Sequence, residues 1–342
     1  MAREFKQETM KYDIVVLGAG VIGLSTAINI QTCLPNRHVV IIADKFTTET
    51  TSNGAAGIFR PTLEKTPAKS LEQFRKWCTD SFDWYHHLNT DHDPSKTGVL
   101  RLSGYQFTDG KIKPPFHHNI GYHFRDLTER ELKSFPGDQK CGWMMSTLMV
   151  ECRRYLPWLT DLFLSRGGRI ENRTVSSIEE FAGKCSLLVT CCGLNAVKLL
   201  NDQEMFPVRG HLIRVKAPWV KHLYVWNSGN NYIYAGQDDV VLGGTRHEGA
   251  YDTSHNEQWF NDILTKCEKI LPGIKNAEVV SKWTGLRPHR TFVRLEPEIM
   301  SFRGKKLQVV HNYGHGANGV ALSWGCGKEA AQIVKDLTIS KL

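Results

Sequence analysis

Apolar runs and helix-like repeats alternate along the first part of the chain. Residues 13–17 (DIVVL) are continuously apolar, which is typical of a strand buried on both faces of a parallel sheet. A glycine-rich stretch at 18–23 (GAGVIG) follows at once and leads into a helical pattern. Residues 38–43 (HVVIIA) then form a second apolar run, which ends at Asp44. This order predicts a complete strand–helix–strand unit.

A long amphipathic helix is predicted after residue 70. Leu71, Phe74, Cys78, Phe82 and Tyr85 recur at helical spacing, and such a stripe usually faces a core. We therefore expect these side chains to be packed in the interior rather than against a ligand.

Beyond this helix the strand pattern returns. Residues 98–107 alternate as a strand does, and Thr128 with Glu131 has the spacing of a capping box that opens a short helix. Residues 155–168 predict a helix that ends in glycine, and two strands follow it, at 169–175 and at 186–191.

The second half of the chain has a different pattern. Residues 208–282 contain strands rich in Tyr, Val and Ile, separated by Gly and Asn turns, with one helix at 256–270, which predicts an antiparallel sheet. The chain closes with another apolar strand, a glycine-rich loop and a helix. The predicted fold class is α/β, with a discontinuous Rossmann-like dinucleotide-binding domain and a second, α+β substrate domain built on the antiparallel sheet. The first domain is expected at 11–60, 145–205 and 285–342, and the second at 61–144 and 206–284.

Composition narrows the class of protein. With 41% hydrophobic and 23% charged residues, 342 residues suffice for two packed cores. No run approaches the roughly 20 apolar residues of a membrane helix, and the polar N-terminus lacks the apolar region of a signal peptide. We expect a soluble chain that is not secreted.

The net charge of +8 is spread without a dense basic run, which argues against nucleic-acid binding. The nine cysteines contain no CxxC pair, which favours buried thiols over a metal or redox site.

The glycine-rich stretch has the features of a phosphate-binding loop. Gly18, Gly20 and Gly23 fit GxGxxG between a predicted strand and a predicted helix, and Asp44 lies 21 positions after Gly23. Glycines allow close approach of the backbone to a pyrophosphate, the helix N-terminus attracts its charge, and the acid can bind ribose hydroxyls. The motif predicts a dinucleotide site without choosing between NAD and FAD. Its place near the N-terminus of a discontinuous domain favours FAD.

Several further blocks resemble one family. They are ADKFTTETTSNGAAG at 43–57, PVRG at 207–210, YIYAG at 232–236, LGGTR at 242–246, GLRPHR at 285–290 and HNYGHGANGVALSWG at 311–325. In this order, and over nearly the whole chain, the sequence resembles the family of D-amino-acid and D-aspartate oxidases.

The resemblance implies FAD bound without a covalent bond across the first domain. Asp44 is expected near the ribose, Thr50, Thr51 and Ser52 near the phosphates and flavin, and the loop at 314–321 around the isoalloxazine ring. The implied cofactor-binding residues are Gly18, Ala19, Gly20, Val21, Ile22, Gly23, Asp44, Lys45, Thr50, Thr51, Ser52, Ala55, Ala56, Gly57, Ile58, Val175, Gly316, Ala317, Asn318, Gly319, Val320 and Ala321.

The same resemblance implies how a substrate is held. Arg287 is expected to bind the α-carboxylate, because a planar guanidinium donates two parallel hydrogen bonds to such a group. Tyr232 is expected to contact the same carboxylate, whereas Tyr234 is expected to serve packing. The backbone at Ala317 is expected to receive the amino group.

Two further arginines bear on the substrate side chain. Arg246 matches the D-aspartate branch of the family and predicts a partner for a side-chain carboxylate, which is costly to bury alone. That branch has another arginine before YIY, where this chain has Val225 and Trp226. Arg60 is expected to point into the site in its place.

The predicted reaction is oxidative deamination of free D-amino acids, with D-aspartate and D-glutamate as leading substrates. The flavin takes a hydride from Cα at its N5, no side chain acts as acid or base, and a 2-oxo acid, ammonia and, with dioxygen, hydrogen peroxide are formed. His311 and His315 are expected to fix the loop by hydrogen bonds. An oxidase of neutral or broad D-amino acids, a non-catalytic flavin-binding protein and an NAD-dependent dehydrogenase remain alternatives.

The terminal Ser340, Lys341 and Leu342 form a peroxisomal address that an import receptor reads. This predicts location in the peroxisomal matrix, in keeping with a peroxide-forming enzyme. The sequence leaves the oligomeric state open, and a homo-oligomer is compatible with it.

Overall fold

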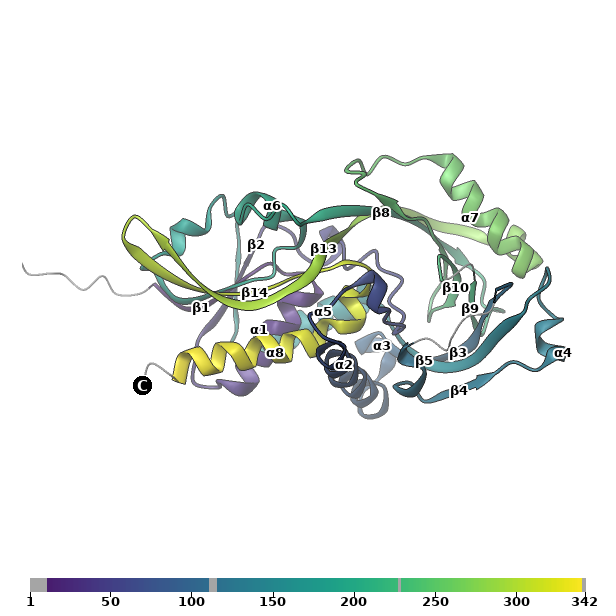
Figure 1. Cartoon of the computed structure of the whole chain (residues 1–342), viewed down its shortest axis with the longest axis horizontal. Helices are drawn as coiled ribbons and strands as arrows, with labels where there is room; N and C mark the ends of the chain where they lie inside the picture. The colour runs from purple at the N-terminus through teal and green to yellow at the C-terminus, as the bar shows by residue number, and fades with distance from the viewer. Residues whose placement is uncertain (1–10, 111–115, 227–228, 340–342) are drawn as a thin grey trace, which may run out of the picture.

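One mixed sheet runs the length of the molecule, with helices against its faces (Figure 1). The computed structural model describes residues 11–110, 116–226 and 229–339, so the expected targeting tail at 340–342 lies outside the described residues. The strand order is β4-β5-β3-β9-β10-β11-β8-β13-β14-β7-β1-β2-β6, with β12 beside β8.

One end of the sheet is parallel, from β14 to β6. Ile14 and Val16 of β1 pack into a core with the long helices, whereas Val15 and Leu17 pack into a separate core on the opposite face. This alternation is why the four residues that follow Asp13 in the run at 13–17 are all apolar. The strands are β1 Tyr12–Leu17, β2 Val39–Ala43, β6 Arg169–Asn172, β7 Cys185–Thr190 and β14 Lys305–His315. The helices of the first core are α1 Val21–Cys33, α2 Leu71–Asp91, α5 Cys152–Ser165 and α8 Gly319–Ile339.

The other end of the sheet is antiparallel except where β3 meets β9. Helix α7, Glu257–Ile270, covers part of it and begins at Asn256, whose side chain accepts from Gln258 N–H. The capping box of Thr128 and Glu131 opens helix α4, Glu129–Leu132. The strands here are β3 Val99–Thr108, β4 His123–Asp126, β5 Cys141–Val150, β8 Phe206–Lys216, β9 Leu223–Trp226, β10 Asn231–Ala235, β11 Val240–Gly243 and β12 His247–Glu248. The short helices are α3 Pro94–Thr97 and α6 Ala196–Leu199.

Strand β13, Glu278–Phe302, joins the two ends. Its first half pairs with β8 and its second half with β14, and the pairing is irregular between His289 and Arg294. The sequence pattern does not predict β13, because glycine, proline and arginine interrupt the apolar alternation of this strand at GLRPHR, residues 285–290. The domain boundaries expected at 144/145 and 284/285 fall inside strands β5 and β13. The division of the chain into two domains at these residues stays a prediction.

The α/β class with a large mixed sheet is confirmed, and two local expectations are corrected. Leu71 is 53% exposed, because it is the first residue of α2 and lies beyond the packed part of the helix. The expected loop at 314–321 is mostly regular: β14 runs to His315, a 3-10 turn spans Gly316–Asn318, and α8 starts at Gly319.

Within the described residues no helix is long and apolar enough to cross a membrane. No disulfide joins any of the nine cysteines.

Candidate active site

A cavity of about 870 Å³ extends from the carboxyl ends of β1 and β2 to the space between β10, β13 and a short 3-10 turn, η2, at Leu63–Lys65. It is at the upper end of the size of small-molecule sites, roughly 300–1,000 Å³. Residues far apart in the sequence line it together, and every expected site residue except Gly23 is among them.

The glycine loop forms the end of the cavity at α1. Gly18 has a φ of +115°, and a Cβ there would lie 2.5 Å from the carbonyl oxygen of Cys191. Gly20 is the N-cap of α1 and has no capping side chain, while Ser52 Oγ accepts from Val21 N–H at 3.1 Å. This helix end therefore offers uncapped N–H groups and positive potential to a phosphate.

Gly23 lies behind this surface. A Cβ at Gly23 would be 1.9 Å from the carbonyl oxygen of Gly18, so its role is to let α1 pack against the loop. Asp44 and Lys45 directly follow β2 and line the cavity beside the loop, at the carboxyl edge of the parallel strands.

A second segment, from Thr50 to Ile58, forms one wall of the cavity. Val150 N–H donates to the carbonyl of Gly57 at 2.7 Å, and Ile58 bridges to Met149 of β5. Another part of the wall is formed by η7, Gly316–Asn318, and the first turn of α8, both of which line the cavity. The uncapped helix end, the small residues and the acid after β2 fit FAD. The Gly18–Ile22 loop has the features expected for a pyrophosphate site, and the position of the flavin stays a prediction.

Arg287 is the central cation at the end of the cavity that lies away from the glycine loop. Its Nη1 donates to the carbonyl of Thr245 at 3.1 Å, and its guanidinium lies against the backbone of Gly210. Burial lowers the pKa of Arg287 from its usual value, and Arg246 acts in the same direction, while Tyr232 opposes the shift. Among the described residues no carboxylate pairs with Arg287. A partly buried guanidinium without a counterion is suited to an anionic ligand.

Tyr232 is held by packing. Its ring stacks on Tyr234 with centroids 4.4 Å apart and planes 9° apart, and it covers Gly243, where a Cβ would lie 2.1 Å from the ring. Tyr234 is buried in the second core, which agrees with the expected packing role, and it also borders the cavity.

Arg60 and Lys65 approach one carbonyl. Arg60 Nη2 donates to Gly229 O at 3.2 Å, and Lys65 Nζ lies 3.5 Å from the same oxygen. Arg60 Nε is buried without a hydrogen-bond partner. Burial, followed by the charges of Arg60, Arg246 and Arg287, lowers the pKa of Lys65 to about 8.

Arg246 lines the cavity but already has a partner. Its Nη2 and Nε donate to Glu248 Oε1 at 2.8 and 3.2 Å. Val225 and Trp226 stand where the resemblance implies another arginine in the D-aspartate branch, and Val225 is fully buried in the second core.

Sequence reasoning missed Lys65, Thr245 and Trp283, all of which line the cavity. The indole of Trp283 lies against Gly54, where a Cβ would be 1.9 Å away. Thr245 lies within the LGGTR block and could have been weighed there. Lys65 and Trp283 belong to no motif, so only the tertiary structure brings them to the site.

His311 and His315, which were both expected to fix the glycine-rich loop by hydrogen bonds, differ in their contacts. His311 bridges Thr190 Oγ1 at 2.8 Å and Glu298 Oε2 at 2.9 Å, as a hydrogen-bonding group does. His315 has a buried Nε2 without a partner, and burial lowers its pKa to about 3, so its ring is neutral.

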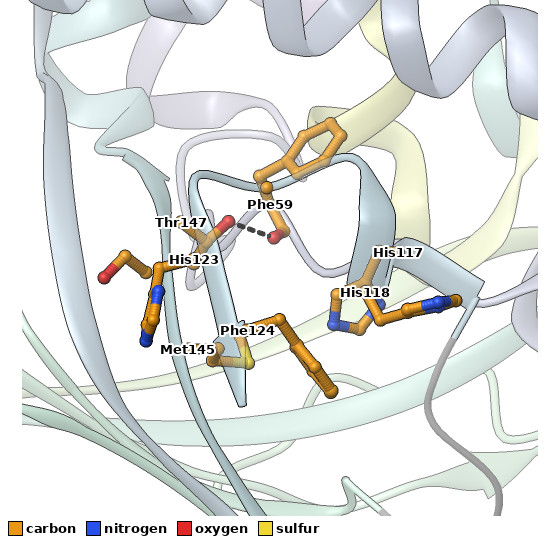
Figure 2. A pocket seen from close by; sticks show the side chains of 9 residues that line it. Phe59, His117, His118, His123, Phe124, Met145 and Thr147 are labelled. Carbon is orange, nitrogen blue, oxygen red and sulfur yellow. Dashed lines mark hydrogen bonds between the residues drawn. The ribbon is translucent and has the colours of Figure 1, made fainter. Parts of the chain in front are cut away.

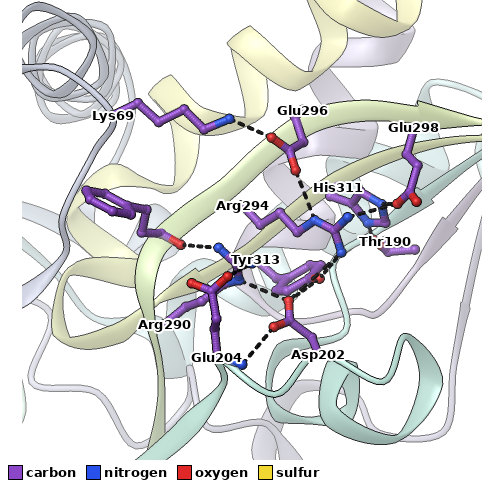
Figure 3. A network of polar contacts seen from close by, with 11 residues as sticks. Lys69, Thr190, Asp202, Glu204, Arg290, Arg294, Glu296, Glu298, His311 and Tyr313 are labelled. Carbon is purple, nitrogen blue, oxygen red and sulfur yellow. Dashed lines mark hydrogen bonds and ion pairs between the residues drawn. The ribbon is translucent and has the colours of Figure 1, made fainter.

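A polar network behind the cavity fixes Tyr313, which lines it (Figure 3). Tyr313 Oη donates to Asp202 Oδ2 at 2.7 Å, and Arg290 Nε donates to the same oxygen at 2.9 Å. Arg294 Nη1 donates to Tyr313 Oη at 3.0 Å. The network ties β13 and β14 to the segment before β8.

Taken together, the Rossmann-like fold and this cavity define a flavin-dinucleotide enzyme with a cationic substrate end. Residues 13–333 match the family described as FAD dependent oxidoreductase, DAO. The chain is 38% identical to the human D-aspartate oxidase over 94% of both chains, and 34% identical to a D-amino acid oxidase of Dugesia ryukyuensis over 95% of this chain and 98% of the relative. Among solved structures, glycine oxidase from Geobacillus kaustophilus has the same fold, with a TM-score of 0.78 at 19% identity over 96% of this chain and 95% of the other.

The chain belongs to the DAO family of FAD-dependent oxidoreductases and is of the D-amino-acid and D-aspartate oxidase type. Its cofactor is FAD, as the sequence predicted.

Proposed function

We propose that this enzyme oxidises free D-amino acids, with acidic ones preferred, to 2-oxo acids, ammonia and hydrogen peroxide. The observation that carries the proposal is the charge of the substrate end. Arg60, Lys65 and Arg287 line it without a carboxylate partner among the described residues, and Arg246 lies beside them paired with Glu248. One α-carboxylate balances one of these charges, and a dicarboxylic substrate balances two.

The residues of the chain position the substrate. Arg287 binds the α-carboxylate by two parallel hydrogen bonds, and Tyr232 contacts the same group, which orients Cα. The backbone at Ala317 receives the amino group. FAD held at the Gly18–Ile22 loop would supply the acceptor for the hydride of Cα and the path of the electrons to dioxygen.

The neutral state of the nearby histidines supports a reaction without an acid–base side chain. Burial lowers the pKa of His289 to about 3, and Arg246, Arg287 and Lys65 act in the same direction. His315 is neutral for the same reason of burial. Neither ring is an imidazolium at neutral pH, so neither can serve as a general acid, and a pKa of about 3 makes each ring a weak base.

The test is peroxide formation by the purified yellow protein with D-aspartate, D-glutamate, D-alanine, D-methionine, glycine and the L-enantiomers. A higher kcat/KM for the acidic pair supports the proposal. Preference for neutral D-amino acids would reject the acidic specificity and keep the reaction, while activity on none would favour a non-catalytic flavin-binding protein.

We also propose import into peroxisomes through Ser340, Lys341 and Leu342, which suits a peroxide-forming enzyme. A fluorescent fusion that keeps these residues exposed at the C-terminus should co-localise with catalase. The same fusion without them should not.

A further inference from the structure

Lys65 and Arg60 form a pair of cations at one wall of the cavity. Both side chains approach the carbonyl of Gly229, and a Cβ at Gly229 would lie 2.4 Å from Arg60 Nη2. One carbonyl oxygen cannot satisfy a guanidinium and an ammonium together, and Arg60 Nε has no partner. The pair therefore retains donors for a further acceptor.

The backbone that carries Arg60 is fixed on both sides. Phe59 N–H donates to Leu148 O at 2.8 Å, and Thr147 Oγ1 donates to Phe59 O at 2.7 Å. His117 Nδ1 donates to the carbonyl of Pro61 at 3.3 Å. Figure 2 shows Phe59, Thr147 and His117 around a separate small cavity of about 10 Å³, which holds at most about one water. Arg60 therefore extends from a rigid segment.

Lys65 is fixed by its neighbours as well. Thr66 Oγ1 donates to the carbonyl of His315 at 2.6 Å, and the carbonyl of Lys65 lies close to Gly316, where a Cβ would be 2.7 Å from it. The Lys65 segment is thus held against η7, beside the expected position of the flavin.

We propose that Lys65 and Arg60 together bind the side-chain carboxylate of an acidic D-amino acid. Binding through the Lys65 ammonium weakens at alkaline pH, where Lys65 loses its proton. This inference rests on the proposed function and deepens it. The pair takes the place of the arginine that is absent at Val225. Arg246, which sequence analysis favoured for this task, donates to Glu248 instead.

The charges around Lys65 explain the pH limit. Burial disfavours the ammonium most, Arg60 beside it, Arg246 after β11 and Arg287 on β13 add to this effect, and Glu64 on η2 opposes it. His289 on β13 is neutral. The pKa of Lys65 is lowered to about 8. A bound carboxylate would raise this pKa, so Lys65 would take up a proton when the ligand binds.

Three variants test the assignment by their effect on KM. Lys65→Met should raise the KM for D-aspartate about tenfold or more and change that for D-methionine less than about twofold, since a charge-assisted bond is lost only with the acidic substrate. Lys65→Arg should largely restore D-aspartate binding. Lys69→Met is the matched control, because Lys69 is exposed, pairs with Glu296 and does not line the cavity.

The pH profile gives a second readout. The ratio of kcat/KM for D-aspartate to that for D-methionine should fall above about pH 8 in the natural enzyme, because Lys65 loses its proton there. The ratio is used because the amino group titrates similarly in the two substrates, so its effect cancels. In Lys65→Arg the ratio should stay level over the same range. A ratio that falls equally in both proteins would overturn the role of Lys65.

Binding of succinate to the FAD-loaded protein tests the inference without turnover. Calorimetry at pH 8 in two buffers of different ionisation enthalpy should show uptake of about half a proton with succinate, since Lys65 is then about half protonated. Butyrate, which lacks the second carboxylate, and the Lys65→Met variant should show none.

The outcomes separate the two proposals. Selective loss of D-aspartate binding in Arg246→Leu but not in Lys65→Met would overturn this inference and leave the oxidase function standing. Absence of all D-amino-acid oxidation would reject the function, while proton uptake with succinate would still support an anion site at Lys65.

Discussion

Gly210 and Arg287 are in direct contact: a Cβ at Gly210 would lie 2.3 Å from Nη2 and 2.4 Å from Cζ of Arg287. The guanidinium that we assign to the α-carboxylate is therefore positioned by the absence of a side chain on the neighbouring strand. Gly210 pairs with Gly285, two residues before Arg287.

Gly210→Ala should displace the Arg287 guanidinium and lower kcat/KM about 10- to 100-fold for acidic and neutral D-amino acids alike, since a misplacement of about 1 Å costs about 100-fold. Steady-state kinetics with D-aspartate and D-methionine measure this. Gly273→Ala is the control, because a Cβ there meets only Trp219 at 3.7 Å. Equal kinetics in the two variants would contradict the contact.

Arg287→Leu should lower kcat/KM at least about 100-fold for every D-amino acid, because about 3 kcal/mol or more of carboxylate binding is lost. FAD should stay bound, since the residue lies at the substrate end of the cavity. The flavin absorbance and the kinetics of the same preparation measure both effects. Loss of flavin in this variant would count against a substrate role.

Gly18→Ala should yield protein that purifies largely without FAD. A φ of +115° is unfavourable for alanine, and the new Cβ would lie 2.5 Å from Cys191 O. The ratio of flavin to protein absorbance gives the occupancy, with Gly273→Ala again as the control. Full occupancy in Gly18→Ala would show that the loop does not need its present backbone conformation.

Asp202→Asn should lower the free energy of unfolding by about 2 kcal/mol at pH 7, because Tyr313 and Arg290 lose a charged acceptor while Arg290 keeps its pair with Glu204. Burial raises the pKa of Asp202, but hydrogen bonds from Tyr313 and Arg290 outweigh it and leave the pKa below its usual value. The stabilisation is thus present above about pH 4, the usual pKa of aspartate, and is lost as the pH falls through the lower folded value. Urea unfolding of the FAD-loaded proteins should show that the difference between them shrinks below about pH 4.

Local patterns predicted the parts of the fold that local chemistry specifies. The strand at 13–17, the capping box at Thr128 and the helix that begins after Asn256 all follow from burial period or capping, which neighbouring residues determine. Strand β13 was not predicted, because it changes partner from β8 to β14 and no local pattern records that change.

The sequence by itself determined the nucleotide loop, the family and the arginine of GLRP, since these are short motifs whose residues act close to one another. Only the tertiary structure decided which cations meet at the substrate end. Arg60 and Lys65 come from one segment, Gly229 from a turn and Arg287 from β13, and they converge because β8, β10, β11 and β13 pair across long separations. Electrostatic coupling depends on distance in space, so the lowered pKa of Lys65 follows from the fold and not from any motif.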